Sequence, residues 1–192
     1  MDVQAYIDNL VKKIHAVTTK DKTGASMSFV NGVEKAVGLI SDVRTHGKKL
    51  IFIGNGASAA MASHMSVDFW KNVGVKAIAF NDAALLTCMG NDYGYPHVFE
   101  KPIEMFADQG DIVLAISSSG KSENIVRAVA MAQQKGCLII TLSGFKDDNP
   151  LSKYGAINFY VPDTEYGPVE VIHQAILHCL ADMVMSLPRE GK

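Results

Sequence analysis

Apolar residues along this chain follow two different spacings, and the change comes near residue 47. Before it, apolar side chains recur every three to four residues, which predicts two amphipathic helices with a break near Gly24 and Ser26. After it, short continuous apolar runs alternate with stretches of helical spacing. The runs predicted to be strands are Leu50–Ile53, Ala77–Phe80, Ile112–Ile116, Leu138–Leu142 and Ile157–Val161.

Continuous apolar strands separated by helices are typical of a parallel sheet covered by helices on both faces. We therefore expect an α/β fold: a three-layer sandwich with a five-stranded parallel sheet, preceded by an N-terminal helical hairpin. The last helix is expected from about Pro168 to Leu187, since proline is favoured at a helix start. No long linker interrupts the pattern, so residues 1–192 are expected to form one domain, with the hairpin at 1–46 and the α/β core at 47–192.

The composition of the chain limits the kinds of partner that we expect it to bind. A net charge of −2 in 192 residues gives no electrostatic reason to expect nucleic acid. No apolar run approaches the roughly 20 residues that span a bilayer, so no membrane association is expected. Cys88, Cys137 and Cys179 are far apart and form no CxxC pair, which favours reduced thiols. With no signal-peptide pattern at the N-terminus, we expect a cytoplasmic protein.

The sequence Ser117-Ser118-Ser119-Gly120-Lys121-Ser122, here called the serine loop, lies between a predicted strand and a predicted helix. A helix N-terminus offers unpaired N–H groups and a positive dipole end, and the hydroxyls add further donors. An ordinary N-cap needs only one such side chain. Four hydroxyls in six positions therefore favour a binding site for an anion, and for phosphate in particular.

A second loop of unusual composition, Gly54-Asn55-Gly56-Ala57-Ser58, follows the first predicted strand and opens a helix; it is called the glycine loop below. With Ala59 it fits the G-x-G-x-x-A form of the dinucleotide fingerprint, but Asp82 comes too late to be the expected acidic residue. The serine loop fails the Walker A pattern as well, since the first glycine would fall at Ala115, inside a strand. Both nucleotide interpretations are disfavoured.

Together with Gly90-Asn91-Asp92-Tyr93-Gly94, these two loops resemble the sugar isomerase (SIS) domain family, in particular its phosphoheptose isomerase branch. The resemblance covers nearly the whole chain. It implies a flavodoxin-like SIS fold and an enzyme that isomerises sedoheptulose 7-phosphate to D-glycero-D-manno-heptose 7-phosphate. It also implies a homotetramer with active sites at subunit interfaces. The residues then expected to bind the phosphorylated sugar are Asn55, Gly56, Ser58, Asp92, Ser117, Ser118, Ser119 and Ser122.

Aldose–ketose isomerisation through an enediol needs a base that moves a proton between neighbouring carbons, and acids or a metal that handle charge on the two oxygens. His64 and Asp68 are four residues apart on one predicted helix, and Glu170 and His178 are eight apart on the last, so each pair shares a flank. The resemblance implies that these four positions bind zinc or another divalent cation. It also implies catalytic roles for Asp68, His178 and Glu170.

Two of these positions depart from the family pattern, which has glutamate at 68 and glutamine at 170. Asp68 reaches roughly 1.3–1.5 Å less far than glutamate, and misplacement on that scale costs on the order of 100-fold in rate. Glu170 adds a negative charge and is a second candidate for the base, after Asp68. The family's arginine-bearing loop is also missing after Asp68, where Lys71 offers only a point charge.

Three functions stay open from the sequence: an isomerase, a sensor that binds sugar phosphate without turnover, and a regulatory relative that binds the replication initiator protein. That relative lacks the helical carboxylate and the final histidine, so Asp68 and His178 favour the enzyme. Taken singly, His64 and His178 would be packed or capped histidines, and Asp92 would be a turn residue. For His173 we expect a structural or interface role.

Overall fold

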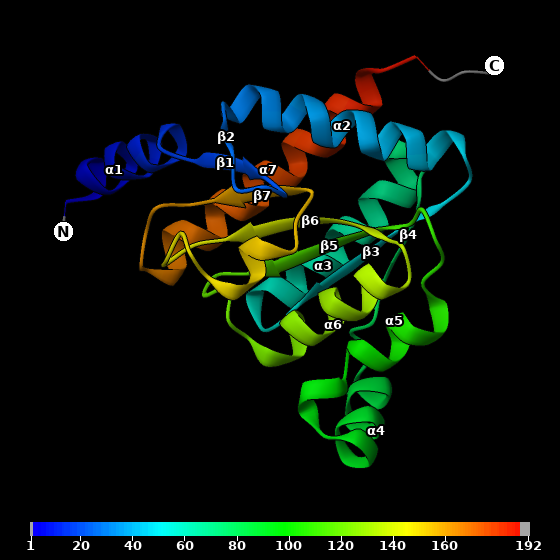
Figure 1. Ribbon diagram of the computed structural model, residues 1–192. Helices are drawn as coiled ribbons and strands as arrows, with labels where there is room; N and C mark the ends of the chain where they lie inside the picture. The colour runs from blue at the N-terminus through cyan, green and yellow to red at the C-terminus, as the bar shows by residue number, and fades with distance from the viewer. Residues whose placement is uncertain (1, 189–192) are drawn as a thin grey trace.

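The computed structural model of the protein describes residues 2–188, and Figure 1 shows one sheet with helices packed around it. The strands are β1 (Thr18–Asp21), β2 (Ser26–Met27), β3 (Lys49–Gly54), β4 (Lys76–Ala79), β5 (Ile112–Ser117), β6 (Leu138–Ser143) and β7 (Ile157–Tyr160). They form a seven-stranded sheet in the order β2-β1-β7-β6-β5-β3-β4. The five predicted strands are β3 to β7, each within one residue of its predicted bounds, and they pair in parallel.

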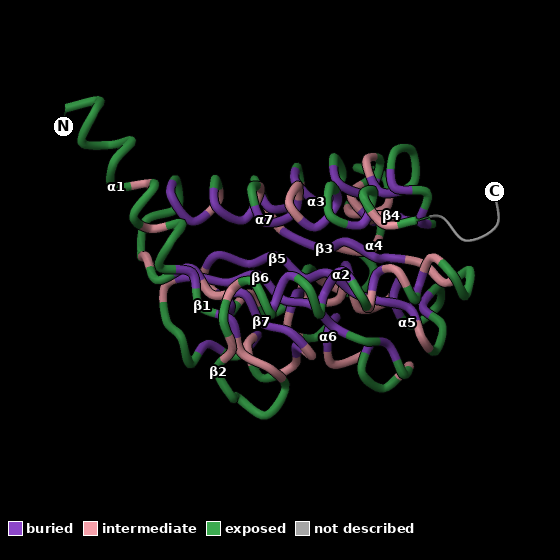
Figure 2. The backbone as a smooth tube through the Cα atoms, turned by 90° about the horizontal axis from the view of Figure 1, so that it is seen from above, coloured by how far each residue is buried: buried purple, intermediate pink, exposed green. Residues whose placement is uncertain are grey.

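Two apolar cores separate three layers. The α-helices are α1 (Val3–His15), α2 (Phe29–Thr45), α3 (Ala57–Asp68), α4 (Ala83–Tyr93), α5 (Glu100–Phe106), α6 (Glu123–Gln134) and α7 (Tyr166–Ser186). Successive strand residues point to opposite faces, so Phe52 joins the core under α2, α3 and α7 while Ile51 joins the core under α5 and α6. Figure 2 shows the buried strands between α3 and α7 on one side and α6 on the other. The three-layer α/β expectation is confirmed.

The segment between the first two helices forms a β-hairpin that the hydrophobic pattern did not indicate. β1 pairs antiparallel with β2 and with β7, which extends the parallel sheet by two strands. The Asp21 carboxylate accepts hydrogen bonds from the backbone N–H groups of Thr23 and Ala25 and so closes the turn. Strands of four and two residues are too short to show an alternating pattern, which is why five strands were expected rather than seven.

Because this β-hairpin intervenes, α1 and α2 differ from the compact helical hairpin that was expected. Figures 1 and 2 both show α1 projecting from the body of the molecule, and none of its residues is buried. Lys13 forms an ion pair with Asp163, just before α7. The apolar stripe that predicted α1 is therefore largely exposed, at Val3, Ile7 and Val11.

A π-helical turn, η1 (Phe69–Val73), continues α3 where the sequence suggested a loop. Single π-turns of this kind are rare and frequently border functional sites. The wider turn buries both Phe69 and Val73 and ends at Gly74, whose φ of 78° favours glycine. Lys71 lies on this helical turn.

The order of the strands determines where a ligand can bind. β3 and β5 are neighbours although β4 lies between them in the sequence, so the direction of strand succession reverses at this pair. In open α/β sheets the loops that leave such a switch point diverge and form a crevice at the carboxyl ends of the strands. Those two loops are the glycine loop and the serine loop. Within residues 2–188, no helix has the length and apolar character needed to cross a membrane.

Candidate active site

A cavity of about 120 Å³ lies at this crevice. Its lining comes from the ends of β3 and β5 and from the first turns of α3 and α7. The lining residues are Asn55, Ser58, Ile116, Ser117, Ser118, Ser119, Ser122, Tyr166 and Glu170. The structure thus brings six of the eight expected sugar-phosphate residues together around one space.

Glycine is required at two positions of the glycine loop. A side chain on Gly54 would collide with the backbone of Ser58, so glycine lets the first turn of α3 pack against the end of β3. Gly56 has φ 55° and ψ −124°, a conformation that strains other residues. Gly56 therefore lies in the predicted loop and shapes it, while Asn55 and Ser58 on either side line the cavity.

Three helices begin near the cavity, and none of them has a capping side chain. No side chain accepts a hydrogen bond at the start of α3, α6 or α7. By contrast, Asp2, Ser28 and Asp82 cap α1, α2 and α4. Uncapped N-termini present free N–H groups and a positive dipole end, which together bind anions. With the serine hydroxyls, they make the cavity a donor-rich site that suits phosphate.

Contacts with Asn149 and Leu151 hold the serine loop in place. Gly120 has φ 63°, and a side chain there would collide with the buried Asn149. The Gly120 N–H donates to the Ser117 carbonyl over 2.9 Å, and the Gly120 carbonyl accepts from the Leu151 N–H over 2.9 Å. The backbone that carries the hydroxyls is thus held in position in advance, which reduces the ordering cost of binding a ligand.

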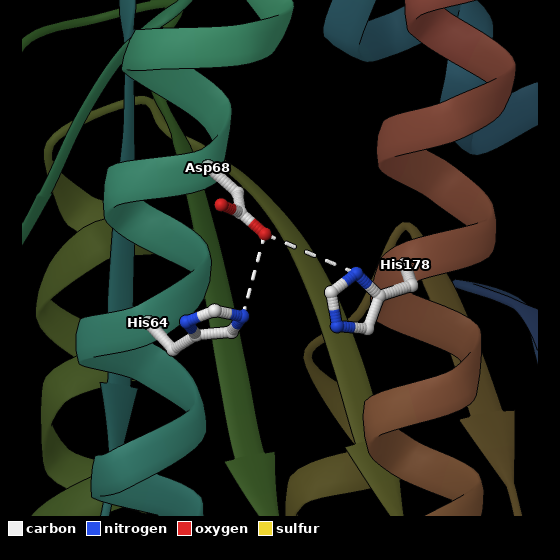
Figure 3. Close-up of side chains that lie close together, drawn as sticks. All are labelled: His64, Asp68 and His178. Carbon is white, nitrogen blue, oxygen red and sulfur yellow. Dashed lines mark ion pairs between the residues drawn. The ribbon is translucent and has the colours of Figure 1, made fainter.

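His64, Asp68 and His178 form a second group, called the triad here, on the facing sides of α3 and α7 (Figure 3). Asp68 Oδ2 lies 3.4 Å from His64 Nε2 and 3.9 Å from His178 Nδ1. The two imidazole rings meet edge to face at 5.6 Å between centroids. Asn72 donates to the other carboxylate oxygen, Asp68 Oδ1, over 3.2 Å and steadies it.

The triad is a possible site for a divalent cation. One ligand atom from each residue lies within 4.8 Å of the other two. Zinc bonds of about 2.1 Å in a tetrahedral arrangement place ligand atoms roughly 3.4 Å apart, close to the distances around Asp68. Two histidines and a carboxylate, with one position left open, are a donor set found in catalytic zinc sites. The expected fourth ligand, Glu170, lies outside this group and lines the cavity.

Asp92 is placed apart from the cavity. It lies near the end of α4, exposed, where its carboxylate accepts hydrogen bonds from Asn91 Nδ2 and from the Cys88 thiol. Figure 1 shows α4 at the far side of α5 and α6 from α7. The fold therefore does not bring this expected substrate contact together with the serine loop in one chain.

Three further residues at the site were missed by the reasoning from sequence. Tyr166 lines the cavity and packs edge to face on Phe145, with ring centroids 5.0 Å apart. Asn124 is buried in the first turn of α6, and Tyr95 reaches Asn55 from the short helix η2 (Tyr95–His97). Asn124 follows the serine loop closely enough that its position offered a signal. Tyr95 and Tyr166 offered none, because their proximity depends on the fold.

His173 has the expected structural role. Its ring is fully buried in α7, and Nε2 lies 3.2 Å from the Ser143 carbonyl oxygen. Burial lowers the pKa of His173 to about 4, against a smaller opposing effect of the Ser143 carbonyl. A neutral ring donating to Ser143 fits that environment.

Comparison with known proteins shows the family to which this chain belongs. The sequence profile of the SIS domain matches residues 6–144. This chain belongs to the SIS domain family. Its SIS relatives include the phosphoheptose isomerase of Helicobacter hepaticus, 34% identical over 160 residues, which are 80% of this chain and 81% of the relative. The phosphoheptose isomerase of Geobacter metallireducens is 36% identical over 144 residues, 72% of this chain and 76% of the relative.

Solved SIS structures show the same fold. The phosphoheptose isomerase GmhA of Neisseria gonorrhoeae superposes with a TM-score of 0.82 at 26% identity, covering 95% of this chain and 97% of that one. The phosphoheptose isomerase of Francisella tularensis gives the same TM-score and identity and covers 95% of each chain. The chain therefore lies in the phosphoheptose isomerase branch of the SIS family.

Proposed function

We propose that this chain is an isomerase that interconverts sedoheptulose 7-phosphate and D-glycero-D-manno-heptose 7-phosphate through an enediol. The observation that carries the proposal is the pairing of a donor-rich cavity with the triad on the same two helices, α3 and α7. The cavity supplies binding, and the triad supplies groups that can move protons. The relatives named as phosphoheptose isomerases support the choice of substrate.

Binding begins with the phosphate. The hydroxyls of Ser58, Ser117 and the rest of the serine loop, with the free N–H groups of three helix starts, surround the cavity. Within residues 2–188, no lysine or arginine lines it. Neutral donors and helix dipoles therefore stabilise the dianion. Glu170 opposes this attraction, since its carboxylate lines the same space.

The distance between the cavity and the triad suits a long sugar. Glu170 at the cavity and His178 in the triad are eight residues apart, about 12 Å along the axis of α7. Side chains on a helix lean toward its N-terminus, so the His178 ring leans back toward the cavity. An extended seven-carbon chain spans roughly 10 Å from its first carbon to its phosphorus on ordinary bond lengths. With the phosphate in the cavity, the carbonyl end would reach the triad.

We assign the proton transfers to Asp68 and His178. Asp68, the preferred base, removes the proton from the carbon beside the carbonyl and later returns it to the former carbonyl carbon. His178 donates a proton to the carbonyl oxygen and takes one from the neighbouring hydroxyl, so that no net proton is gained or lost. Both groups are partly exposed, so substrate can approach them. Glu170 remains the second candidate for the base, because it is the carboxylate nearest to the phosphate site.

His64, Asp68 and His178 are also the residues that would hold a divalent cation such as zinc, and when bound it would polarise the substrate oxygens. Asp68 would therefore serve both as the base and as a ligand of the cation. As a ligand it would hold the cation together with the two histidines, while Asp68 Oδ1 accepts a hydrogen bond from Asn72.

We further propose that the chain is one SIS domain over residues 1–192 that acts as a homotetramer, with active sites at subunit interfaces. The exposed apolar stripe of α1 supports association, since such a stripe normally packs against another surface. The separation of Asp92 from the cavity is consistent with a site completed by a neighbouring subunit. Three free cysteines fit the reducing cytoplasm as its location.

The test is direct incubation of the purified protein with sedoheptulose 7-phosphate, with and without zinc, followed by NMR of the sugar. We expect the heptose 7-phosphate to form, faster with zinc, and a chelator to slow its formation. Tight binding of the sugar phosphate without turnover would replace the isomerase by a sensor.

A further inference from the structure

The carboxamide of Asn55 is held by an unusually complete set of hydrogen bonds. Asn55 Nδ2 donates to Asn124 Oδ1 over 2.9 Å, and Asn124 Nδ2 donates back to Asn55 Oδ1 over 2.9 Å. The Tyr95 hydroxyl donates to the same Asn55 Oδ1, also over 2.9 Å. Asn124 is buried and Tyr95 lies at the surface, so one buried and one exposed side chain hold the amide.

These hydrogen bonds leave one hydrogen-bonding group of the Asn55 carboxamide unused. A carboxamide has two acceptor lone pairs on oxygen and two N–H donors. Asn124 and Tyr95 use both lone pairs, and Asn124 uses one N–H. The remaining N–H is available to the cavity that Asn55 lines. A single free donor suits an oxygen of the phosphorylated sugar.

Tyr95 reaches Asn55 because of the backbone around it. Gly94, with φ 84° and ψ 152°, ends α4 in a conformation that favours glycine and turns the chain back. Pro96 then fixes the backbone of the short helix η2. Tyr95 as a residue is 57% exposed, so the hydrogen bond of its hydroxyl, and not the packing of its ring, connects it to the site.

We propose that Tyr95 is a positioning residue: its hydroxyl fixes the Asn55 carboxamide so that the free N–H donates to the bound sugar phosphate. The inference rests on the proposed function. It assigns a role to η2 beyond connecting α4 with α5, because the Tyr95 hydroxyl links that segment to Asn55 of the glycine loop.

The test compares Tyr95→Phe with Tyr93→Phe in the isomerase assay. Tyr93 is similarly exposed, and its ring faces Lys101 on α5. We expect Tyr95→Phe to raise the KM for sedoheptulose 7-phosphate about fivefold, the effect of one lost hydrogen bond, with kcat nearly unchanged. Tyr93→Phe should change neither constant. Both variants remove one hydroxyl from an exposed ring, so folding should be preserved.

A double-mutant cycle then shows whether Tyr95 acts through Asn55. In an Asn55→Ala background, Tyr95→Phe should have no further effect on KM, because the carboxamide it positions is gone. An equal rise of KM in both backgrounds, or an unchanged KM for Tyr95→Phe alone, would overturn the inference. Absence of turnover by the wild-type chain would instead overturn the proposed function, and the inference with it.

Discussion

Asp68 and Glu170 carry the same charge in different surroundings. Asp68 lies between two histidines and accepts a hydrogen bond from Asn72. Glu170 lies among serine hydroxyls that we propose bind a phosphate. Spacing along α7 suggested one cluster of four residues, but helical geometry places Glu170 two turns from His178. The spacing of eight residues already implies this separation along α7, whereas the grouping of Asp68 with the two histidines is seen only in the structure.

Glu170→Gln should improve binding of the sugar phosphate. Removing a negative charge close to the phosphate is worth about 1 kcal/mol in a solvent-screened site, so we expect KM to fall about fivefold with kcat little changed. Steady-state kinetics of the variant and of Glu165→Gln, an exposed control one residue before α7, give the comparison. A fall in kcat of about 100-fold or more would make Glu170 the base in place of Asp68.

Because His173 is buried, we expect the stability of the protein to depend on pH. Because burial lowers its pKa to about 4 in the folded protein, its contribution is complete above the unfolded value of 6.5 and is lost as pH falls from there toward 4. The loss between pH 7 and pH 4.5 should be roughly 2–3 kcal/mol. Urea unfolding at both values measures it, with His173→Gln expected to reduce the difference and His46→Gln, an exposed control, to leave it. Equal pH dependence in all three proteins would contradict this role.

At the scale of elements, apolar runs predicted the strands well because β3, β5 and β6 are buried on both faces. Elements held by packing rather than by their own pattern were not predicted. β1 is stabilised by its pairing with β7, and η1 by burial of Phe69 and Val73. Neither has a run long enough to show a period.

Two glycines of α2 test how closely β1 packs on this helix. A side chain on Gly32 would collide with the buried Thr19 of β1, whereas Gly38 has open space around it. Gly32→Ala should therefore destabilise the protein by about 1–3 kcal/mol, and Gly38→Ala should stabilise it by up to about 1 kcal/mol. Thermal unfolding distinguishes the two. A Gly32→Ala protein as stable as wild type would contradict the packing of β1 on α2.

At the scale of the whole molecule, strand order brings the two loops together. The sequence placed each loop after a strand, but hydrophobic patterns do not say which strands are neighbours. The pairing of β3 with β5 puts the glycine loop beside the serine loop and aligns α3 with α7. From the sequence, the phosphate cavity could therefore be predicted only as two separate loops. The triad could be predicted only as members of two residue pairs, His64 with Asp68 and Glu170 with His178. Tyr95 and Tyr166 depend on the complete fold.

The proposed homotetramer can be tested on α1. Val11→Glu places a charge in the exposed apolar stripe, while Asn9→Glu places one on the opposite, polar side of the helix. Light scattering should give about four times the 20.7 kDa chain mass for wild type and Asn9→Glu, and a smaller mass for Val11→Glu. A monomeric wild type, or a Val11→Glu protein of unchanged mass, would contradict a role of α1 in assembly.

The central claim is that the cavity binds the sugar phosphate while the triad performs the chemistry. His178→Gln tests it most directly, because it removes the imidazole ring from the triad and leaves the cavity intact. Turnover of sedoheptulose 7-phosphate and its calorimetric affinity should be measured on the same preparation. The account predicts that turnover falls by at least about 100-fold while affinity is nearly unchanged. Unchanged turnover in His178→Gln would contradict it.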